Sequence, residues 1–307
     1  MTTPATMSGL LSPVVTPFTA DLSPDTARLI RHCKWLLSQN CGLAVFGTNS
    51  EANSLSVDER LEMLDALIEA GIDPARMMPG TGCSAITDSV RMTRHAVSKG
   101  VGGVLMLPPF YYKNVSDEGL FRNYAEIIEK VGDSRLKIYL YHFPAMSAVP
   151  LGLALIERLL KAYPETVVGI KDSSGDLENL KAMLNAFPGF GVFAGTEALL
   201  LDNMRLGGVG CISATANVNP GAISNLFDNW ESPEADELQA GLNALRGTVQ
   251  KFPMIPALKK LVSHYMDDSE WNRVRPPLVE LTEEHETALL SAVKELGFDM
   301  PGIKDVI

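Results

Sequence analysis

The sequence that runs from Lys137 to Lys171 reads KIYLYHFPAMSAVPLGLALIERLLKAYPETVVGIK. It begins and ends with a short apolar run, and between these runs apolar side chains recur with the period of a helix. A short buried strand, a helix and a second short strand form the unit that builds parallel sheets with helical crossovers. This stretch therefore predicts one such unit, with strands over 137–141 and 167–171.

The same pattern continues in both directions and predicts eight strands. The six further strand candidates are residues 10–15, 43–46, 77–79, 103–107, 191–194 and 210–213. Eight strand–helix units, with no glycine-rich dinucleotide turn after the first strand, favour a closed (β/α)8 TIM barrel over a doubly wound sheet. We expect the α/β class, with this barrel over residues 1–220.

The C-terminal part of the chain is longer than the last barrel helix requires. Residues 221–307 predict that helix and a C-terminal helical extension, which several prolines divide into pieces. No linker rich in glycine, serine or proline separates this part from the rest. We therefore expect the extension to belong to the same domain as the barrel.

Several residues predict where the helices begin and end. The expected N-caps are Ser23, Ser56, Ser116 and Asp176. Pro24 follows the first of these, and Glu59 completes a capping box with Ser56. Glycines that come directly after helical segments predict helix ends with a left-handed backbone. These are Gly42, Gly71, Gly100 and Gly207.

Composition excludes some partners and disfavours metal chemistry. The 307 residues carry a net charge of −11, which repels nucleic acid phosphates and anionic membranes but still permits a small anionic substrate bound by local donors. The four cysteines show no C-x-x-C spacing, and the five histidines have no zinc-binding spacing. We expect no metal and no cofactor. With no run of about 18 apolar residues and no export signal, we expect a cytoplasmic protein.

Lys171 is the first candidate for chemistry, because catalytic groups of this barrel lie at the C-terminal ends of its strands. One interpretation is a lysine that keeps its amine in water and pairs with Asp172. The other interpretation is a catalytic lysine, and it requires that the amine is buried. Removal of an amine from water lowers its pKa because the ammonium form is disfavoured, and a neutral amine can attack a ketone to form an imine.

Tyr141 ends the neighbouring predicted strand, where its phenol could accept and donate a proton beside Lys171. Without that partner, an aromatic residue at a strand end is more often core packing. Strand alternation should turn His142 and Asp172 to the opposite face, so His142 is interpreted as a packing residue rather than a catalytic one.

The turn after the second predicted strand, Phe46-Gly-Thr-Asn-Ser-Glu51, is rich in small hydroxyl and amide residues. Its backbone N–H groups could bind a carboxylate. The alternative is an ordinary polar loop that caps the next helix.

Together these segments resemble the superfamily of dihydrodipicolinate synthase and N-acetylneuraminate lyase, which contains class I aldolases and lyases. The resemblance covers almost the whole chain. Its motifs are Pro13–Phe18, Gly47-Thr48-x-x-Glu51, Pro108–Lys113, Tyr141-x-x-Pro144, Gly169-Ile170-Lys171-Asp172 and GCISATANV over 210–218.

The resemblance implies roles for particular residues. Lys171 would be the Schiff-base lysine, Tyr141 the acid–base group, and Thr48, Asn49 and Ser50 the turn that holds the carboxylate of a keto acid. The backbone around Ile212 would line the site. The resemblance also implies a homotetramer, in which either Tyr111 or Tyr112 would reach the proton relay of a neighbouring subunit. Of the two, Tyr112 is the candidate for a catalytic residue.

Two departures from the family pattern bear on the substrate. Synthases of the family resemble Y-N-V-P-G-R-T after the fifth strand, with an arginine for the carboxylate of aspartate semialdehyde, whereas this chain has Met146 at that position. The turn usually reads G-T-T-G-E or G-S-T-G-E, whereas here Asn49 and Ser50 replace the second hydroxyl residue and the glycine. A left-handed backbone at Ser50 would be strained.

Three functional hypotheses remain. The first is an aldolase or hydro-lyase that acts on a 2-keto acid, with pyruvate or a pyruvate-like group bound covalently to Lys171. The second is dihydrodipicolinate (4-hydroxy-tetrahydrodipicolinate) synthase proper, which the missing arginine opposes. The third is a barrel that binds a keto acid without turnover, because a fold alone does not determine catalysis.

Overall fold

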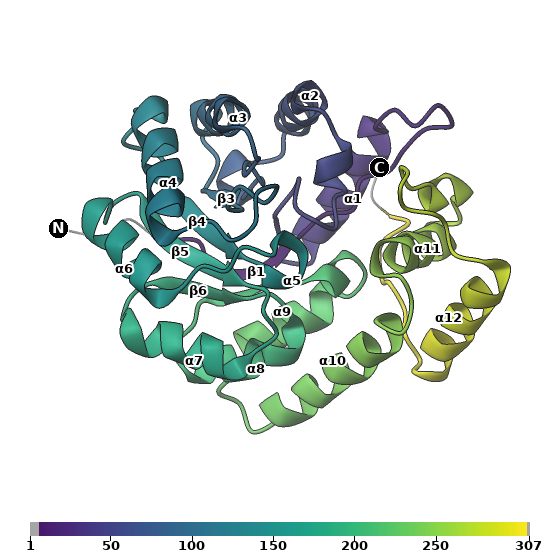
Figure 1. Ribbon diagram of the computed structural model, residues 1–307. Helices are drawn as coiled ribbons and strands as arrows, with labels where there is room; N and C mark the ends of the chain where they lie inside the picture. Colours follow the sequence, from purple (N-terminus) through teal and green to yellow (C-terminus); the bar gives the residue numbers. More distant parts are fainter. Residues whose placement is uncertain (1–5, 306–307) are drawn as a thin grey trace. The chain divides into compact units, whose positions relative to one another are not determined.

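The computed structural model describes residues 6–305 (Figure 1). The chain divides into two compact units. One consists of the residues up to Gly9 together with Asp73–Cys211, and the other of Leu10–Ile72 together with the residues from Ile212 onward. The assignment of residues 221–307 to the same domain as the barrel stays a prediction.

The first unit is built on five parallel strands in the order β7-β6-β5-β4-β3. They are β3 (Val104–Met106), β4 (Ile138–His142), β5 (Val167–Asp172), β6 (Gly191–Ala194) and the start of β7 (Gly210–Ile212). Nearly every residue of these strands is buried, as expected for strands that are covered on both faces.

Helices alternate with these strands along the chain. They are α3 (Ile86–Ser98), α4 (Asp117–Val131), α5 (Pro144–Ser147), α6 (Leu153–Ala162), α7 (Leu177–Ala186) and α8 (Leu200–Arg205), with short 3-10 turns at Pro74–Arg76 and Glu197–Leu199. Each longer helix buries one apolar stripe. In α6, for example, Leu155, Ile156 and Leu159 face inward while charged residues face solvent. Figure 1 shows α6 and α7 beside β4, β5 and β6.

Three of the expected strands differ from the prediction. The strands expected over 10–15 and 43–46 end earlier, at Ser12 and Leu43, and the strand expected over 77–79 is not formed. Residues 77–79 belong to no strand of the described chain, and only an isolated parallel bridge joins Gly80 to Leu105. The Leu105 N–H donates to Pro79 O at 3.0 Å, and the Thr81 N–H donates to Leu105 O at 3.0 Å. Pro79 lacks an N–H group and cannot extend the ladder.

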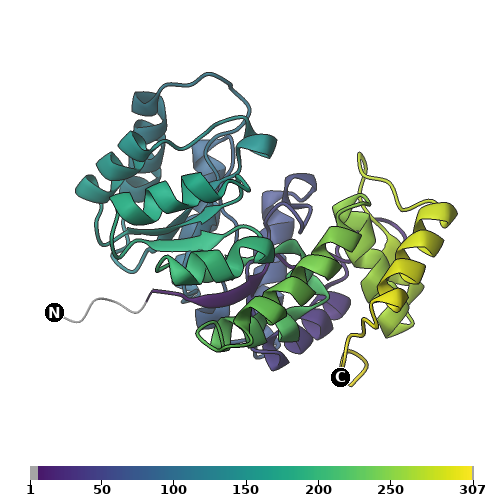
Figure 2. The same cartoon turned by 90° about the horizontal axis from the view of Figure 1, so that it is seen from below.

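The second unit contains most of β1 (Gly9–Ser12), which pairs in parallel with β2 (Gly42–Leu43). Its helices are α1 (Thr26–Ser38), α2 (Val57–Glu69), α9 (Pro220–Asp228), α10 (Ala235–Val249), α11 (Met254–Met266) and α12 (Glu283–Glu295), with 3-10 turns at Ala52–Ser54, Ala214–Asn217 and Ser269–Asn272. Helices α10, α11 and α12 contact one another and form the C-terminal helical part (Figure 1 and Figure 2). Within residues 6–305, no helix is long and apolar enough to cross a membrane.

Most of the predicted helix boundaries agree with the structure. Ser116 and Asp176 are N-caps, and Ser56 forms a complete capping box with Glu59. The prediction for the first helix was wrong. Asp25, rather than Ser23, caps α1 by accepting the Arg28 N–H, whereas Ser23 follows a tight turn and accepts the Thr19 N–H through its carbonyl oxygen.

Three of the four glycines expected to end helices do have a left-handed backbone. Their φ values are +84° at Gly71, +81° at Gly100 and +90° at Gly207. The prediction for Gly42 was wrong, since Asn40 takes the left-handed position with φ of 58° and Gly42 begins β2. Asparagine tolerates this conformation better than most residues, so no glycine is needed there.

The core of the second unit contains a buried histidine. His32 of α1 lies between Trp35 and Trp271, with ring centroids 5.6 Å and 5.2 Å from its own. Burial lowers the pKa of His32 to about 4, because a charged imidazolium would be poorly solvated there.

Candidate active site

Lys171 and Tyr141 meet across two neighbouring strands of the first unit. They are aligned in the parallel pairing of β4 with β5, and Lys171 Nζ donates a hydrogen bond to the Tyr141 hydroxyl oxygen at 3.3 Å. The nitrogen also lies 4.4 Å from the centroid of the Tyr141 ring. Both side chains are only 3% exposed. The burial that imine chemistry requires is therefore present.

Asp172 is not the partner of Lys171. Its carboxylate accepts hydrogen bonds from the Ser174 N–H at 2.9 Å and from Asn179 Nδ2 at 3.0 Å. Among residues 6–305, no carboxylate forms an ion pair with Lys171. The interpretation as a lysine paired with Asp172 is therefore excluded.

His142 is aligned with Asp172 one residue further along both strands. Its Nδ1 accepts the Leu151 N–H at 3.1 Å, which ties β4 to the segment before α6. Burial lowers the pKa of His142, although the negative charge of Asp172 acts in the opposite direction. These contacts agree with the interpretation of His142 as a packing residue, which stays a prediction.

The turn after β2 belongs to the second unit, and its backbone is held by internal hydrogen bonds. Ser50 Oγ accepts the Gly47 N–H at 3.2 Å, and Ser50 O accepts the Thr16 hydroxyl at 2.7 Å. Thr48 and Asn49 are half-buried at the tip. No other described residue engages the N–H or the side chain of Asn49, which leaves donors available for a ligand.

The strained position in this turn is not the expected one. Ser50 has no positive φ, whereas Glu51 is left-handed with φ of 55° and Phe46 with φ of 61°. The replacement of the family's glycine by Ser50 therefore causes no left-handed strain at that residue. Substitution by serine is compatible with this backbone, and its hydroxyl adds a hydrogen bond within the turn.

Ile212, the last residue of β7, is fully buried in the second unit. The segment that follows is fixed by Asn217, whose Oδ1 accepts the Val15 N–H at 2.9 Å and whose Nδ2 donates to Pro13 O at 3.2 Å. Arg246 Nη1 lies 3.4 Å from Ser213 Oγ, next to Ile212 in the chain.

The aromatic loop of the first unit is exposed. Tyr111 and Tyr112 are 73% and 74% exposed, and their rings contact each other edge to face with centroids 5.4 Å apart. Lys113 Nζ donates to Ser147 O at 3.0 Å, so the loop is attached to the end of α5. Met146, within α5, is 64% exposed.

The sequence did not predict the contacts of two further residues of the second unit, Lys259 and Arg275. Lys259 of α11 forms an ion pair with Glu51, and both side chains are inaccessible to solvent. Arg275 donates its backbone N–H to Glu51 Oε2 at 2.8 Å. One sequence signal could have indicated this buried charge. Lys259 lies three residues from Pro256 and three from Val262, on the apolar face of a helix.

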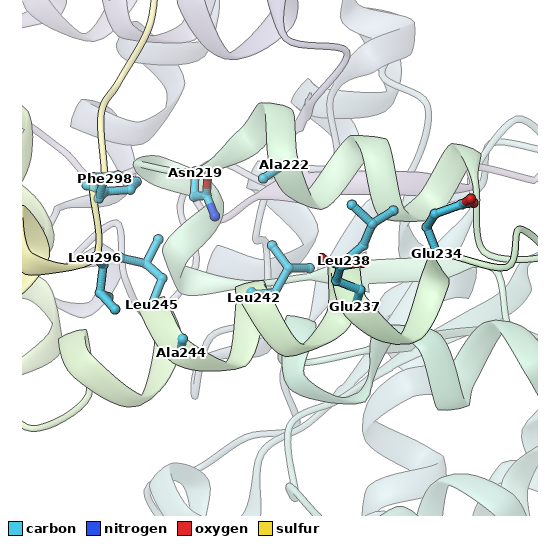
Figure 3. Close-up of a pocket in the computed structure, with 11 residues that line it drawn as sticks. Asn219, Ala222, Glu234, Glu237, Leu238, Leu242, Ala244, Leu245, Leu296 and Phe298 are labelled. Carbon is cyan, nitrogen blue, oxygen red and sulfur yellow. The ribbon is translucent and has the colours of Figure 1, made fainter.

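The second unit also contains a groove of about 620 Å³ between α9, α10 and the segment after α12. Leu238, Leu242 and Leu245 of α10 line it on one side, and Phe298 lies at the end near Leu245 (Figure 3). None of the residues predicted for the site lines this groove. Among residues 6–305, no cluster of three or more histidine, cysteine or acidic side chains could hold a metal ion.

Comparison with known proteins gives a consistent result. The model of the dihydrodipicolinate synthetase family matches residues 6–296. A protein of Chloroflexus aurantiacus described as a DapA-like lyase is 32% identical over 292 residues, which cover 94% of this chain and 96% of that protein.

Solved structures are similar over the same range. The dihydrodipicolinate synthase of Agrobacterium tumefaciens has a TM-score of 0.88 at 32% identity and covers 94% of this chain and 99% of its own. YagE of Escherichia coli, a member of the dihydrodipicolinic acid synthase family solved with pyruvate, has a TM-score of 0.87 at 25% identity, with coverages of 96% and 100%. These similarities confirm the expected TIM barrel with a C-terminal helical part.

Proposed function

Because the chain belongs to the dihydrodipicolinate synthetase family, whose members are class I aldolases and lyases, we propose that Lys171 forms a Schiff base with a 2-keto acid. The observation that carries this proposal is the 3.3 Å contact between Lys171 Nζ and the Tyr141 hydroxyl, with both side chains buried. The chain is an enzyme of the lyase class, and Lys171 is our candidate for its covalent residue.

The proposed chemistry begins with a neutral amine on Lys171. Its nitrogen attacks the keto carbon, so that a carbon–nitrogen bond forms as the π bond of the carbonyl breaks, and a proton passes from the nitrogen to the oxygen to give a carbinolamine. A second proton allows that oxygen to leave as water, which produces a protonated imine. The imine accepts the electron pair of a breaking bond, and water later hydrolyses it to release the product and the amine.

Tyr141 is the proposed proton carrier for these steps. Its hydroxyl lies within hydrogen-bonding reach of the amine, so it can deliver a proton to the departing oxygen and recover one later. A phenol suits both directions because it can donate and accept. Positioned proton transfer of this kind contributes about 10²- to 10⁴-fold to a rate.

The remaining roles rest on the family resemblance. We propose that Thr48, Asn49 and Ser50 bind the carboxylate of the keto acid, with Thr48 also taking part in proton transfer. Support for carboxylate binding comes from the unengaged donors of Asn49. Ile212 is proposed as a lining residue through its backbone. Tyr111 or Tyr112 is proposed for a relay shared between subunits of a cytoplasmic homotetramer, which a measurement of the mass in solution would test.

Pyruvate, or a group resembling it, is the proposed end of the substrate that Lys171 binds. The pyruvate in the YagE structure supports this choice. A second candidate is dihydrodipicolinate synthase proper, which the similarity to the Agrobacterium tumefaciens enzyme favours. Met146 opposes it, because a thioether cannot form the ion pair that an arginine forms with a second carboxylate. A barrel without turnover is opposed by the buried Lys171–Tyr141 pair.

Reductive trapping tests the proposal directly. Incubation with pyruvate and borohydride should reduce the imine and leave a stable adduct on the peptide that contains Lys171. Lys171→Ala should form no adduct, and Lys171→Arg should also fail because guanidinium stays protonated. Lys137→Ala is the matched control, since Lys137 precedes β4 and its amine donates to the Glu165 carbonyl. An adduct on another lysine would refute the assignment.

A further inference from the structure

The ion pair between Glu51 and Lys259 joins two distant parts of the second unit. Glu51 ends the turn after β2, whereas Lys259 lies on α11, 208 residues away in the sequence. Both side chains are 0% exposed, and the amine of Lys259 bonds directly to Glu51 Oε1. Buried charges of this kind are rare and need several partners.

The carboxylate of Glu51 is held on both oxygens. Oε1 accepts from Lys259, and Oε2 accepts the Arg275 N–H at 2.8 Å. At its backbone, the Glu51 N–H donates to Thr48 O at 3.1 Å, and φ is 55°. A non-glycine residue keeps a left-handed conformation only where its surroundings over-determine it. The two bonds to the carboxylate supply that constraint.

Lys259 is equally constrained. Its amine donates to Arg273 O at 2.6 Å and lies 4.4 Å from the centroid of the Phe18 ring. Burial lowers the pKa of Lys259 to about 8, although the charge and hydrogen bond of Glu51 act in the opposite direction. The position of the amine is therefore determined by three groups that converge on it.

Arg275 anchors the far side of the same turn. Its guanidinium donates to Ser54 O at 2.7 Å, to Leu22 O at 2.8 Å and to the carboxylate of Glu59, which completes the capping box of α2. The turn that contains Thr48 and Asn49 is thus attached at Glu51 and, three residues later, at Ser54. An apolar contact in place of the ion pair would fill space without fixing the direction of the turn.

We propose that Glu51 and Lys259 are positioning residues for ligand binding: their ion pair holds the Gly47–Glu51 turn in the conformation that binds the substrate carboxylate. This inference rests on the proposed function of Thr48, Asn49 and Ser50. It makes the C-terminal helix α11 part of the machinery that recognises the keto acid, through a pair that does not itself touch the substrate.

Pyruvate trapping at Lys171 measures ligand binding. The half-saturating pyruvate concentration would not change if Glu51 and Lys259 only stabilised the fold. For each variant, the rate of borohydride inactivation is measured against pyruvate concentration, which separates half-saturation from the maximal rate. Lys259→Met should raise the half-saturating pyruvate concentration at least about 10-fold, or about 1.4 kcal/mol, and change the maximal rate less than about 3-fold. Lys260→Met is the matched control, because Lys260 lies next to Lys259 on α11 but pairs with Glu286 of α12 instead of the turn.

Two more variants keep the test decisive if Lys259→Met folds poorly. Glu51→Gln retains the side-chain shape and an acceptor for Arg275, and it should raise half-saturation in the same way. The double variant Glu51→Gln/Lys259→Met contains no unpaired buried charge, so it should regain thermal stability but keep the weakened pyruvate binding. Half-saturation within twofold of wild type in Glu51→Gln, or restored in the double variant, would overturn the inference. Failure of the wild-type protein to be trapped would instead refute the proposed function.

Discussion

Tyr141 and Lys171 are aligned residues of adjacent parallel strands, and their polar atoms lie 3.3 Å apart in a part of the first unit that solvent hardly reaches. Backbone pairing alone thus joins the proposed nucleophile to the proposed proton carrier. No loop has to close to bring the two groups together. The strands therefore supply the preorganised geometry that catalysis by positioned groups requires.

Tyr141→Phe should lower turnover while leaving the covalent residue in place. The variant loses the hydroxyl, so we expect the exchange of pyruvate methyl protons in D2O, followed by NMR, to slow about 10²- to 10⁴-fold. The borohydride adduct should still map to Lys171. Tyr139→Phe is the control, because Tyr139 is a buried tyrosine of the same strand whose hydroxyl oxygen accepts the Met7 N–H at 2.7 Å. Equal exchange rates in Tyr141→Phe and wild type would remove Tyr141 from the mechanism.

The exposed tyrosines allow a test of subunit sharing. If Tyr112 acts in a neighbouring subunit, Tyr112→Phe and Tyr141→Phe proteins should each be nearly inactive, whereas their mixture should form hybrid oligomers with some intact sites. The same experiment with Tyr111→Phe decides which tyrosine fills the role. Mass spectrometry must first establish that subunits exchange. Exchange without recovered activity for either tyrosine would contradict a shared relay.

Met146 predicts weak use of aspartate semialdehyde. Loss of one partner from an ion pair with a substrate carboxylate commonly costs about 2 to 5 kcal/mol, so kcat/KM with pyruvate and the semialdehyde should lie below about 10⁴ M⁻¹s⁻¹. Met146→Arg should raise it at least about 10-fold, and Met146→Leu should not. Efficient condensation by the wild-type protein would instead favour dihydrodipicolinate synthase proper.

His32 should make the protein sensitive to acid. Its folded-state pKa is lowered from 6.5 to about 4, so the unfolded chain binds the proton more readily. The stabilisation is complete above pH 6.5 and is lost as the pH falls toward 4, with about 2 kcal/mol lost at pH 5. Thermal unfolding between pH 7 and pH 5 should show a smaller decline for His32→Leu than for wild type. Parallel declines in the two proteins would show that His32 contributes nothing to this dependence.

The parts of the fold that sequence predicts well are those set by local periodicity. β6 was predicted with its observed bounds, and β4 and β5 to within one residue at either end. Tyr141 and Lys171 could be paired because strand ends in parallel sheets meet at one edge. The strand predicted over residues 77–79 is wrong because a short apolar run resembles a strand in sequence. Pro79 at its end has no N–H group and cannot continue the hydrogen-bond ladder.

Local periodicity does not predict which distant segments of the chain contact each other. Nothing local in the turn after β2 shows that Glu51 is left-handed, because the residues that constrain it, Lys259 and Arg275, lie more than 200 residues further along the chain. The same limit explains the error at Ser50. The left-handed conformation was expected at the position of the family's glycine, whereas in this chain it occurs at Glu51, one residue later.

The alternation of side chains along β4 and β5 restricts how this protein can evolve. Tyr141 and Lys171 form one aligned pair, and His142 and Asp172 form the next. Deletion of a single residue before Tyr141 within β4 would shift the register and set an imidazole where the phenol now stands. Insertions and deletions are tolerable only beyond the strand ends, in the segments around 143–152 and 173–176. Descendants with new substrates should therefore differ in loop length there, while both strands keep an unchanged number of residues.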